Sequence, residues 1–199
     1  MIDILVMAAG ESRRYGSAKQ LADIGGTAML RRIVLQVLET GARVTVVIGA
    51  NADAVSACVA DLKITVIRND RWSSGMGESI ATGVADIAGR QPATSAILVA
   101  LADQPLVDPG DFRRMLAAHR AAPERIVAAD HGNGVIGVPA LFPPVFHDAL
   151  RGLSGPRGAR LLLERHAADI DAIAMPAARI DIDTPEDLAN LVARPNWAP

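Results

Sequence analysis

A segment near the N-terminus combines small residues with cationic side chains. Residues 7–19 read Met-Ala-Ala-Gly-Glu-Ser-Arg-Arg-Tyr-Gly-Ser-Ala-Lys and follow the apolar run Ile4-Leu5-Val6. Small residues let a ligand approach the backbone, whose N–H groups then point at an anion, and cationic side chains neutralise the charge of that anion. We therefore expect a phosphate-binding loop directly after a buried strand. The cations of the loop are Arg13, Arg14 and Lys19, and the residues expected to contact the ligand are Ala8, Ala9, Gly10, Ser12, Arg13 and Lys19.

The spacing of the glycines excludes two familiar phosphate loops. A P-loop reads G-x-x-x-x-G-K-S/T, whereas five residues separate Gly10 from Gly16, and Lys19 comes three positions later. The dinucleotide fingerprint reads G-x-G-x-x-G, but Ser12 and Tyr15 stand where its second and third glycines would be. The segment is therefore predicted to hold phosphate in another kind of site.

A carboxylate follows a second apolar run. Ala96–Leu101 is followed by Ala102-Asp103-Gln104-Pro105. In open parallel sheets ligands bind beyond the carboxyl ends of the strands, so we expect Asp103 at the same edge as the phosphate loop. A carboxylate and a triphosphate repel each other unless a cation lies between them, and Mg²⁺ is the expected bridge. The alternative is that Asp103 caps the helix expected from Pro109, but Asp108 already occupies that position.

Two further aspartates precede the last expected helix. Side chains alternate along an extended segment, so Asp181 and Asp183 are predicted to lie on one side of the chain. The residues that follow them, Thr184-Pro185-Glu186-Asp187, are typical of a helix start. By themselves, these residues predict a simple cap and turn.

Strands and helices are expected to alternate along the chain. The strand-like runs are Ile2–Met7, Val44–Ile48, Ile64–Ile67, Ala96–Leu101, Ile126–Ala129, Gly134–Val138 and Asp171–Met175. The helix-like runs are Ala28–Glu39, Ala52–Ala60, Gly77–Ala88, Pro109–Ala121, Arg157–His166 and Pro185–Val192. This order predicts an α/β, three-layer Rossmann-like fold, with a mostly parallel twisted sheet of about seven strands and helices on both faces. We expect one domain over residues 1–193, a lid or substrate loop in the Gly/Pro-rich stretch 131–144, and a C-terminal tail over 194–199.

Composition narrows the class of protein. Half of the 199 residues are apolar and the net charge is −2, which argues against a general nucleic-acid binder. Cys58 is the single cysteine, so no disulfide can form within the chain, and this favours a cytoplasmic setting. The apolar runs fall short of the ~20 residues that span a membrane, so we expect no membrane partner.

The motifs together resemble those of a known family. Residues 7–19 are similar to the signature loop of nucleotidyltransferases of the molybdenum cofactor type: apolar-Ala-Ala-Gly-x-Ser-x-Arg-x-Gly and then Lys. These MobA-like NTP transferases belong to the nucleotide-diphospho-sugar transferase superfamily. The segment from Gly75 to Ser79 resembles the family's glycine-then-Ser segment, and Asp183-Thr184-Pro185-Glu186 resembles its C-terminal Asp/Asn-Thr-Pro-Glu motif.

The resemblance implies an activity and a role for each of these residues. It is strongest to the molybdenum cofactor cytidylyltransferase branch, through Lys19-Gln20-Leu21, Asp103-Gln104-Pro105 and residues 181–187. It implies an enzyme that joins CTP to the terminal phosphate of molybdopterin, releases pyrophosphate, and serves hydroxylases of the xanthine dehydrogenase type. A molybdoenzyme or its maturation chaperone is the implied protein partner. The implied roles are catalysis by Arg13, Lys19 and Asp103, metal binding by Asp103 and Asp183, and base and ribose contacts by Gly75 and Ser79.

Two segments in the second half of the chain bear on the acceptor. Gly137-Val138-Pro139 and Gly155–Arg160 resemble segments near the family's acceptor substrate, which implies acceptor-binding roles for Gly137, Pro139, Arg157 and Arg160. A guanidinium matches phosphate bidentately; surface charge on a helix is the alternative for both arginines. Ala22 and Asp23 replace a leucine and a proline that many members carry near the base, which leaves GTP open as the donor.

Three other functions stay open at this point. The chain is also compatible with a sugar-phosphate or methylerythritol-phosphate cytidylyltransferase, or with a guanylyltransferase for the molybdenum cofactor. A non-catalytic nucleotide-binding or cofactor-delivery protein is the alternative from another class.

Overall fold

All seven strands join one sheet. The computed structural model of the chain describes residues 1–90 and 93–194. The sheet has the order β3-β2-β1-β4-β6-β5-β7, in which β6 runs antiparallel to its neighbours β4 and β5 while the other pairs are parallel. The strands are β1 (Ile2–Ala8), β2 (Arg43–Ile48), β3 (Thr65–Arg68), β4 (Ala96–Leu101), β5 (Ile126–Asp130), β6 (Ile136–Phe142) and β7 (Ile170–Ala174).

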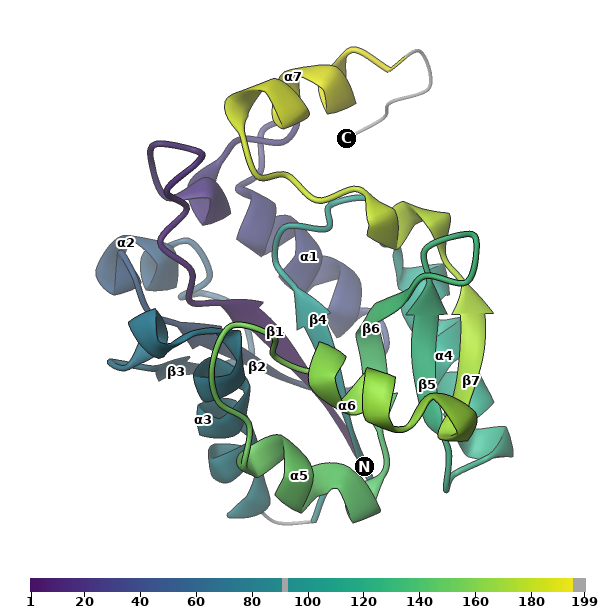
Figure 1. Cartoon of the computed structure of the whole chain (residues 1–199). Helices are drawn as coiled ribbons and strands as arrows, with labels where there is room; N and C mark the ends of the chain where they lie inside the picture. Colours follow the sequence, from purple (N-terminus) through teal and green to yellow (C-terminus); the bar gives the residue numbers. More distant parts are fainter. Residues whose placement is uncertain (91–92, 195–199) are drawn as a thin grey trace.

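Helices cover both faces of this sheet (Figure 1). One face packs on α1 (Met29–Leu38), α2 (Ala52–Ala57) and α4 (Pro109–Ala121). The other face packs on α3 (Met76–Ala88), α5 (His147–Arg151) and α6 (Arg160–Arg165). Strand alternation sorts the core, because Ile4 and Val6 of β1 join the first layer while Leu5 and Met7 join the second. The short 3₁₀ turns are η1 (Lys19–Leu21), η2 (Trp72–Ser74), η3 (Pro144–Phe146), η4 (Ala167–Asp169) and η5 (Pro176–Arg179).

The predicted fold class is confirmed, and the differences are local. Half of the expected loop over residues 131–144 folds as β6, whose C-terminal half is buried between β4 and β5. The helix expected from Arg157 begins at Arg160, because Gly155 and Gly158 adopt positive φ angles in the preceding turn. The short α5 was not predicted from the sequence. Of the expected tail, residues 195–199 lie outside the described part of the chain.

The carboxyl ends of β1 and β4 bring the expected site together. The N–H of Ala102, just after β4, donates to the carbonyl of Met7 in β1. The segment before α7 (Pro185–Val192) then crosses this edge, where the N–H of Ile182 donates to the carbonyl of Asp103. Ile182 is fully buried with Ile24 and Met29, so a small apolar cluster fixes the aspartates on either side of it. Among the described residues, no helix has the length and hydropathy needed to cross a membrane.

Candidate functional site

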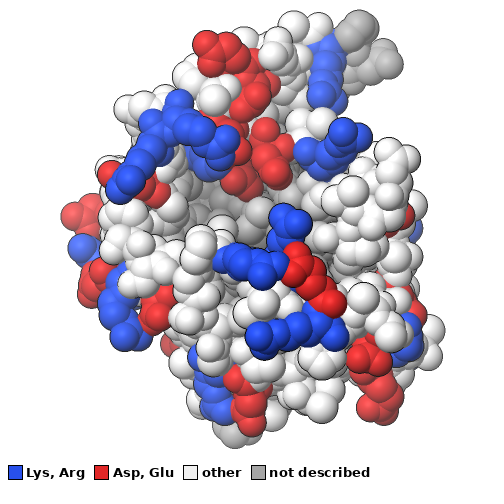
Figure 2. All heavy atoms as spheres, viewed as in Figure 1, with Lys and Arg blue, Asp and Glu red and all other residues white. Residues whose placement is uncertain are grey.

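A cleft of about 500 Å³ opens at this edge of the sheet. It is lined by every residue expected to hold the nucleotide or the metal: Ala8, Ala9, Gly10, Ser12, Arg13, Lys19, Gly75, Ser79, Asp103 and Asp183. Figure 2 shows a hollow on the face seen in Figure 1, with acidic side chains at its upper edge between basic ones and further basic side chains below it. The sequence therefore selected residues that do meet in space.

The loop after β1 is braced from within. Gln20 is 2% exposed, and its side-chain amide donates to the carbonyls of Ala8 (3.0 Å) and Gly10 (2.8 Å). Ser12 turns the chain with a φ of 61°, and its hydroxyl donates to the side-chain oxygen of Gln20 over 3.2 Å. One buried amide thus fixes the backbone that is expected to face phosphate, a role that sequence reasoning did not assign to Gln20.

Gly10 contributes open space beside the backbone rather than an unusual backbone conformation. Its φ lies outside the left-handed region, and a Cβ atom built there would meet no described atom within 4 Å. Neither the conformation nor the packing of the protein requires glycine here. The missing side chain leaves the backbone open toward the cleft, as close approach by an anion requires.

Lys19 joins the two candidate metal ligands. Its ammonium donates to Oδ2 of Asp103 and to Oδ1 of Asp183, both over 2.7 Å. The Lys19 side chain is 14% exposed, and those of Asp103 and Asp183 are 21% and 31% exposed. Burial alone would lower the pKa of Lys19, but the two carboxylates outweigh it and raise that pKa. Lys19 is therefore protonated and contributes a positive charge to the cleft.

Arg14 also reaches this cluster, whereas Arg13 does not. One guanidinium nitrogen of Arg14 donates to Oδ2 of Asp183 over 2.7 Å. Arg13 pairs with Glu11 over 2.6 Å and its side chain is 82% exposed, so it lies at the rim of the cleft. The sequence did contain the signal, because the arginine of the loop pattern Ser-x-Arg-x-Gly falls on residue 14.

The two aspartates have donor atoms that suit a hard divalent cation. Oδ1 of Asp103 is buried and has no hydrogen-bond partner among the described residues, which is costly for a carboxylate oxygen that no cation contacts. Mg²⁺ and Mn²⁺ prefer carboxylate oxygens, and one or two carboxylates suffice when phosphate oxygens and water complete the shell. Within residues 1–90 and 93–194 there is no group of three or more acidic, histidine or cysteine side chains that suits a metal. The pair therefore fits a cation that is shared with a phosphate ligand.

Asp183 is held in place by the start of α7. Thr184 and Asp187 form a capping box, in which the Asp187 side chain accepts from the N–H of Thr184 over 2.8 Å. The same carboxylate accepts from the N–H of Asp183 over 3.0 Å. The cap that the sequence predicted is thus present, and it orients Asp183 as well.

Two glycine segments that are far apart in the sequence pack directly on each other. A Cβ atom on Gly75 would lie 2.5 Å from the carbonyl carbon and oxygen of Gly155, and the N–H of Gly77 donates to that carbonyl over 2.9 Å. Ser79 lies in the first turns of α3 rather than at its start, and its hydroxyl accepts from the Asn69 side chain over 3.0 Å. The wall of the first cleft is therefore in direct contact with the loop before α6.

A second cavity of about 310 Å³ adjoins the first, since Met76 and Leu101 line both. Three of the four expected acceptor residues line it: Gly137, Arg157 and Arg160. Pro139 does not, because it is buried within β6, and Val138 lines the cavity instead.

Asp181 also lines this second cavity. Surrounding protein atoms desolvate the carboxyl of Asp181, and the negative charges of Asp103 and Asp183 lie near it. Both effects raise the pKa of Asp181 to about 6, although the residue is exposed to the cavity.

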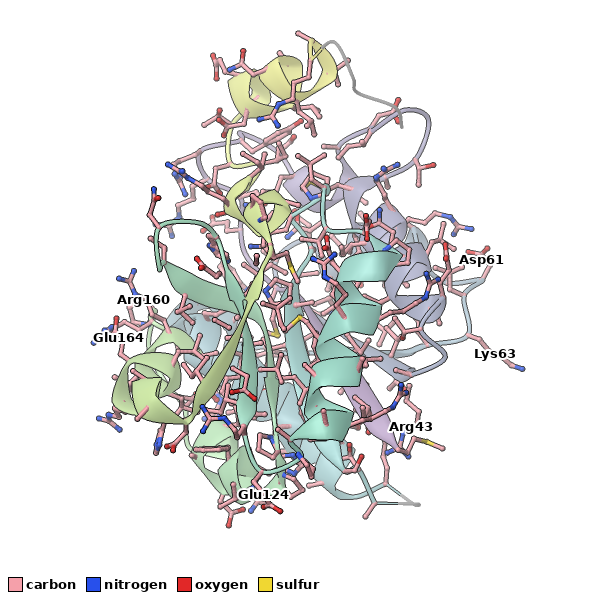
Figure 3. All side chains as sticks on the ribbon, turned by 90° about the vertical axis from the view of Figure 1, so that its right-hand side faces the viewer. Arg43, Asp61, Lys63, Glu124, Arg160 and Glu164 are labelled. Atoms are coloured by element: carbon pink, nitrogen blue, oxygen red, sulfur yellow. The ribbon has the colours of Figure 1, made fainter. Side chains whose placement is uncertain are left out.

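Both arginines at this cavity pair with Glu164. Arg160 donates to Oε1 of Glu164 over 2.9 Å, and Arg157 contacts Oε2 of the same carboxylate. These hydrogen bonds lower the pKa of Glu164. Figure 3 shows Arg160 and Glu164 side by side on the outer side of α6. An anionic ligand would therefore compete with Glu164 for these guanidinium groups.

Comparison with known proteins relates this chain to a family. Residues 4–170 match the MobA-like NTP transferase domain. Nicotine blue oxidoreductase of Paenarthrobacter nicotinovorans is 32% identical over 201 residues, which cover 94% of this chain and 95% of that protein. Molybdenum cofactor guanylyltransferase of Rhodobacter capsulatus is 29% identical over 187 residues, 93% of this chain and 92% of that protein.

Solved structures agree with this relationship. The crystal structure of Rv0371c from Mycobacterium tuberculosis H37Rv superimposes with a TM-score of 0.80 at 25% identity, over 98% of this chain and 99% of that one. A structure of Rv0371c in complex with manganese gives a TM-score of 0.76 at 26% identity, over 96% and 97% of the two chains. A protein that shares this fold and about a quarter of its sequence has therefore been solved in complex with a divalent metal.

Proposed function

The chain belongs to the MobA-like NTP transferase family of nucleotidyltransferases, and we propose that it transfers the nucleoside monophosphate of CTP to the phosphate of a molybdopterin-type acceptor, releasing pyrophosphate. The observation that carries the proposal is the cluster of Lys19, Asp103 and Asp183 beside the braced loop after β1. This cluster supports the proposal because cations and paired carboxylates together suit a triphosphate and a divalent cation.

The donor side of the reaction requires charge to be neutralised. The open backbone at Gly10 and the cations Arg13 and Lys19 hold the triphosphate in the first cavity. Asp103 and Asp183 hold a divalent cation, for which Mg²⁺ is the proposed choice; when bound, it offsets charge on the phosphate oxygens. Arg14 keeps Asp183 oriented toward the cleft.

The acceptor side requires positioning rather than a protein nucleophile. The phosphate of the acceptor is already anionic and attacks the α-phosphorus of the nucleotide in line with the departing pyrophosphate. Met76 and Leu101 line both cavities. A nucleotide in the first cavity and an acceptor in the second would therefore lie next to each other. The site therefore acts by holding them in register and by stabilising charge.

The lining of the second cavity supports a heterocyclic acceptor over a sugar phosphate. Its walls include the apolar side chains of Ile80, Val99, Leu101, Ile136, Val138 and Leu163. A flat ring system matches such walls, whereas most hydroxyl groups of a sugar would lose water against apolar side chains there. Gln104, His131 and Asp181 supply the polar contacts, and Arg157 and Arg160 the charge for a phosphate.

Several finer points belong to the same proposal. CTP is favoured by the resemblance of residues 19–21 and 181–187 to the cytidylyltransferase branch; GTP is the alternative donor, because a relative is named molybdenum cofactor guanylyltransferase. We assign residues 1–193 to a single catalytic domain. A cytoplasmic setting, and delivery of the product to a molybdoenzyme or its maturation chaperone, complete it.

A redox function is the second candidate, because a relative of 32% identity is named nicotine blue oxidoreductase. The apolar walls of the second cavity would also suit a flat dye. However, the loop after β1 lacks the glycine spacing of a dinucleotide fingerprint, and the Lys19 cluster has a clear use only with phosphate. Supplying the chain with a nicotinamide donor and nicotine blue, and in parallel with CTP and molybdopterin, separates the two activities by loss of dye absorbance or release of pyrophosphate.

A further inference from the structure

Lys19 occupies the space between the two carboxylates that are proposed to hold a divalent cation. Its ammonium is 2.7 Å from an oxygen of each, and Arg14 binds the other oxygen of Asp183 at 2.7 Å. Two positive side chains thus balance two negative ones. In this arrangement Lys19 and Arg14 neutralise the two carboxylates, so the pair has a low affinity for a further cation.

The same ammonium is proposed to bind the triphosphate, but two of its three N–H donors are taken by the carboxylates, so a full set of phosphate contacts requires it to leave them. Lys19 has a compact charge on a flexible four-carbon stem, so it can exchange one anion for another by a change of rotamer. Its backbone is held by the η1 turn, where the N–H of Ala22 donates to the carbonyl of Lys19 over 3.0 Å. The side chain can therefore move without the loop.

We propose that Lys19 is an exchangeable counter-ion that couples binding of the triphosphate to binding of the divalent cation. Lys19 pairs with Asp103 and Asp183 while the cleft is empty and transfers to the phosphates when the nucleotide enters. Asp183 then keeps its ion pair with Arg14, and Asp103 loses the one ion pair that it forms among the described residues. Their affinity for a divalent cation rises, and by linkage the cation raises the affinity for nucleotide by the same factor.

This inference rests on the proposed function, because it needs Asp103 and Asp183 to bind a cation and Lys19 to bind phosphate. It adds an order of events that neither role contains. Free divalent cations in solution would not occupy the carboxylates of the empty protein to a large extent. The metal would be recruited together with the nucleotide.

Removing the counter-ion tests the exchange directly. Mn²⁺ is titrated into the full chain without nucleotide, and free Mn²⁺ is measured by electron paramagnetic resonance. Lys19→Gln removes the competing charge, so it is expected to bind Mn²⁺ about tenfold more tightly than the wild type, within the usual range of coupling between sites. Lys63→Gln removes an exposed positive charge outside the cleft and is expected to bind Mn²⁺ like the wild type.

A second titration measures the coupling itself. CTP is expected to tighten Mn²⁺ binding to the wild type by about tenfold, after correction for Mn²⁺ bound by free CTP, and to have a much smaller effect on Lys19→Gln. Circular dichroism verifies folding, and Lys19→Met, which keeps the apolar stem, serves if the glutamine variant does not fold. Equal Mn²⁺ affinity in wild type and Lys19→Gln would overturn this inference alone. If none of the proteins binds Mn²⁺, with or without CTP, the metal assignment in the proposed function fails and the inference fails with it.

Discussion

Lys19 and Asp103 are 84 positions apart in the sequence, yet the ammonium of Lys19 donates to Oδ2 of Asp103 over 2.7 Å. The contact spans the carboxyl ends of β1 and β4, which are neighbours in the sheet. Parallel strands align their carboxyl ends at one edge, so residues that follow two such strands meet there. A phosphate loop and a metal-binding carboxylate are thus combined by topology.

Asp103→Asn keeps the size of the side chain and removes its charge. We expect the rate of metal-dependent nucleotidyl transfer to fall by about 10²–10³-fold or more. The divalent cation would lose a charged ligand, so it could no longer be held beside the phosphates. Lys19 would keep its contact with Asp183, so the fold should be preserved. Steady-state rates with CTP and acceptor, combined with a thermal melt, check both parts. Near-normal activity in this variant would contradict the role of Asp103.

Gly10→Ala separates space for a ligand from a requirement of the fold. The added methyl group meets no described protein atom within 4 Å, so stability should be unchanged or rise by less than about 1 kcal/mol. The methyl would lie where the phosphate approaches and disturb a charge-assisted hydrogen bond, which costs about 1.5–3 kcal/mol. We therefore expect the KM for the triphosphate to rise about tenfold or more. A normal KM together with normal stability would remove this loop from the site.

Gly75→Ala should behave in the opposite way. The new Cβ would lie 2.5 Å from the carbonyl of Gly155, and Gly75 has a φ of +114°, so both crowding and backbone strain oppose the change. A loss of about 2 kcal/mol or more in the free energy of unfolding is expected, measured by urea denaturation. Gly89→Ala is the matched control, because its nearest atom is 3.7 Å away, and its effect should stay within about 0.5 kcal/mol. Equal stability of the two variants would refute the packing of residue 75 against residue 155.

The pKa of Asp181 makes stability depend on pH. It is about 6 in the folded protein and has an ordinary value of 3.8, so the folded state binds this proton more tightly than the unfolded state. The resulting stabilisation is complete below about pH 4 and is lost as the pH rises through about 6. Asp181→Asn should therefore match the wild type in Tm near about pH 4 and exceed it near about pH 7.5. Glu124→Gln, which alters an exposed carboxylate before β5, supplies the baseline, and a Tm difference that does not change with pH would contradict the shift.

Patterns of local origin were predictable from the sequence. Apolar runs and helical periodicity gave the seven strands and the main helices, because both reflect which face each element buries. The loop after β1 and the carboxylate after β4 followed from residue types and from the rule for parallel sheets. Helix capping at Thr184 and Asp187 was equally local.

What could not be predicted depends on contacts between distant segments. Whether Lys19 points toward phosphate or toward Asp103 and Asp183 depends on which charges the fold brings near it. The close packing of Gly75 on Gly155 is likewise invisible until α3 and the loop before α6 are placed together. The partner of Arg14 is of the same kind, since the loop pattern marks residue 14 as its arginine but does not show that this arginine contacts Asp183. These are properties of tertiary structure rather than of any local motif.

The most direct test of the account is release of pyrophosphate by the purified chain. Each of the four nucleoside triphosphates is supplied with Mg²⁺, with and without molybdenum-loaded molybdopterin, and Asp103→Asn serves as the inactive control. We predict release that requires both Mg²⁺ and the acceptor, is greatest with CTP, and disappears in the variant. No acceptor-dependent pyrophosphate with any of the four nucleotides would contradict the proposed transfer reaction.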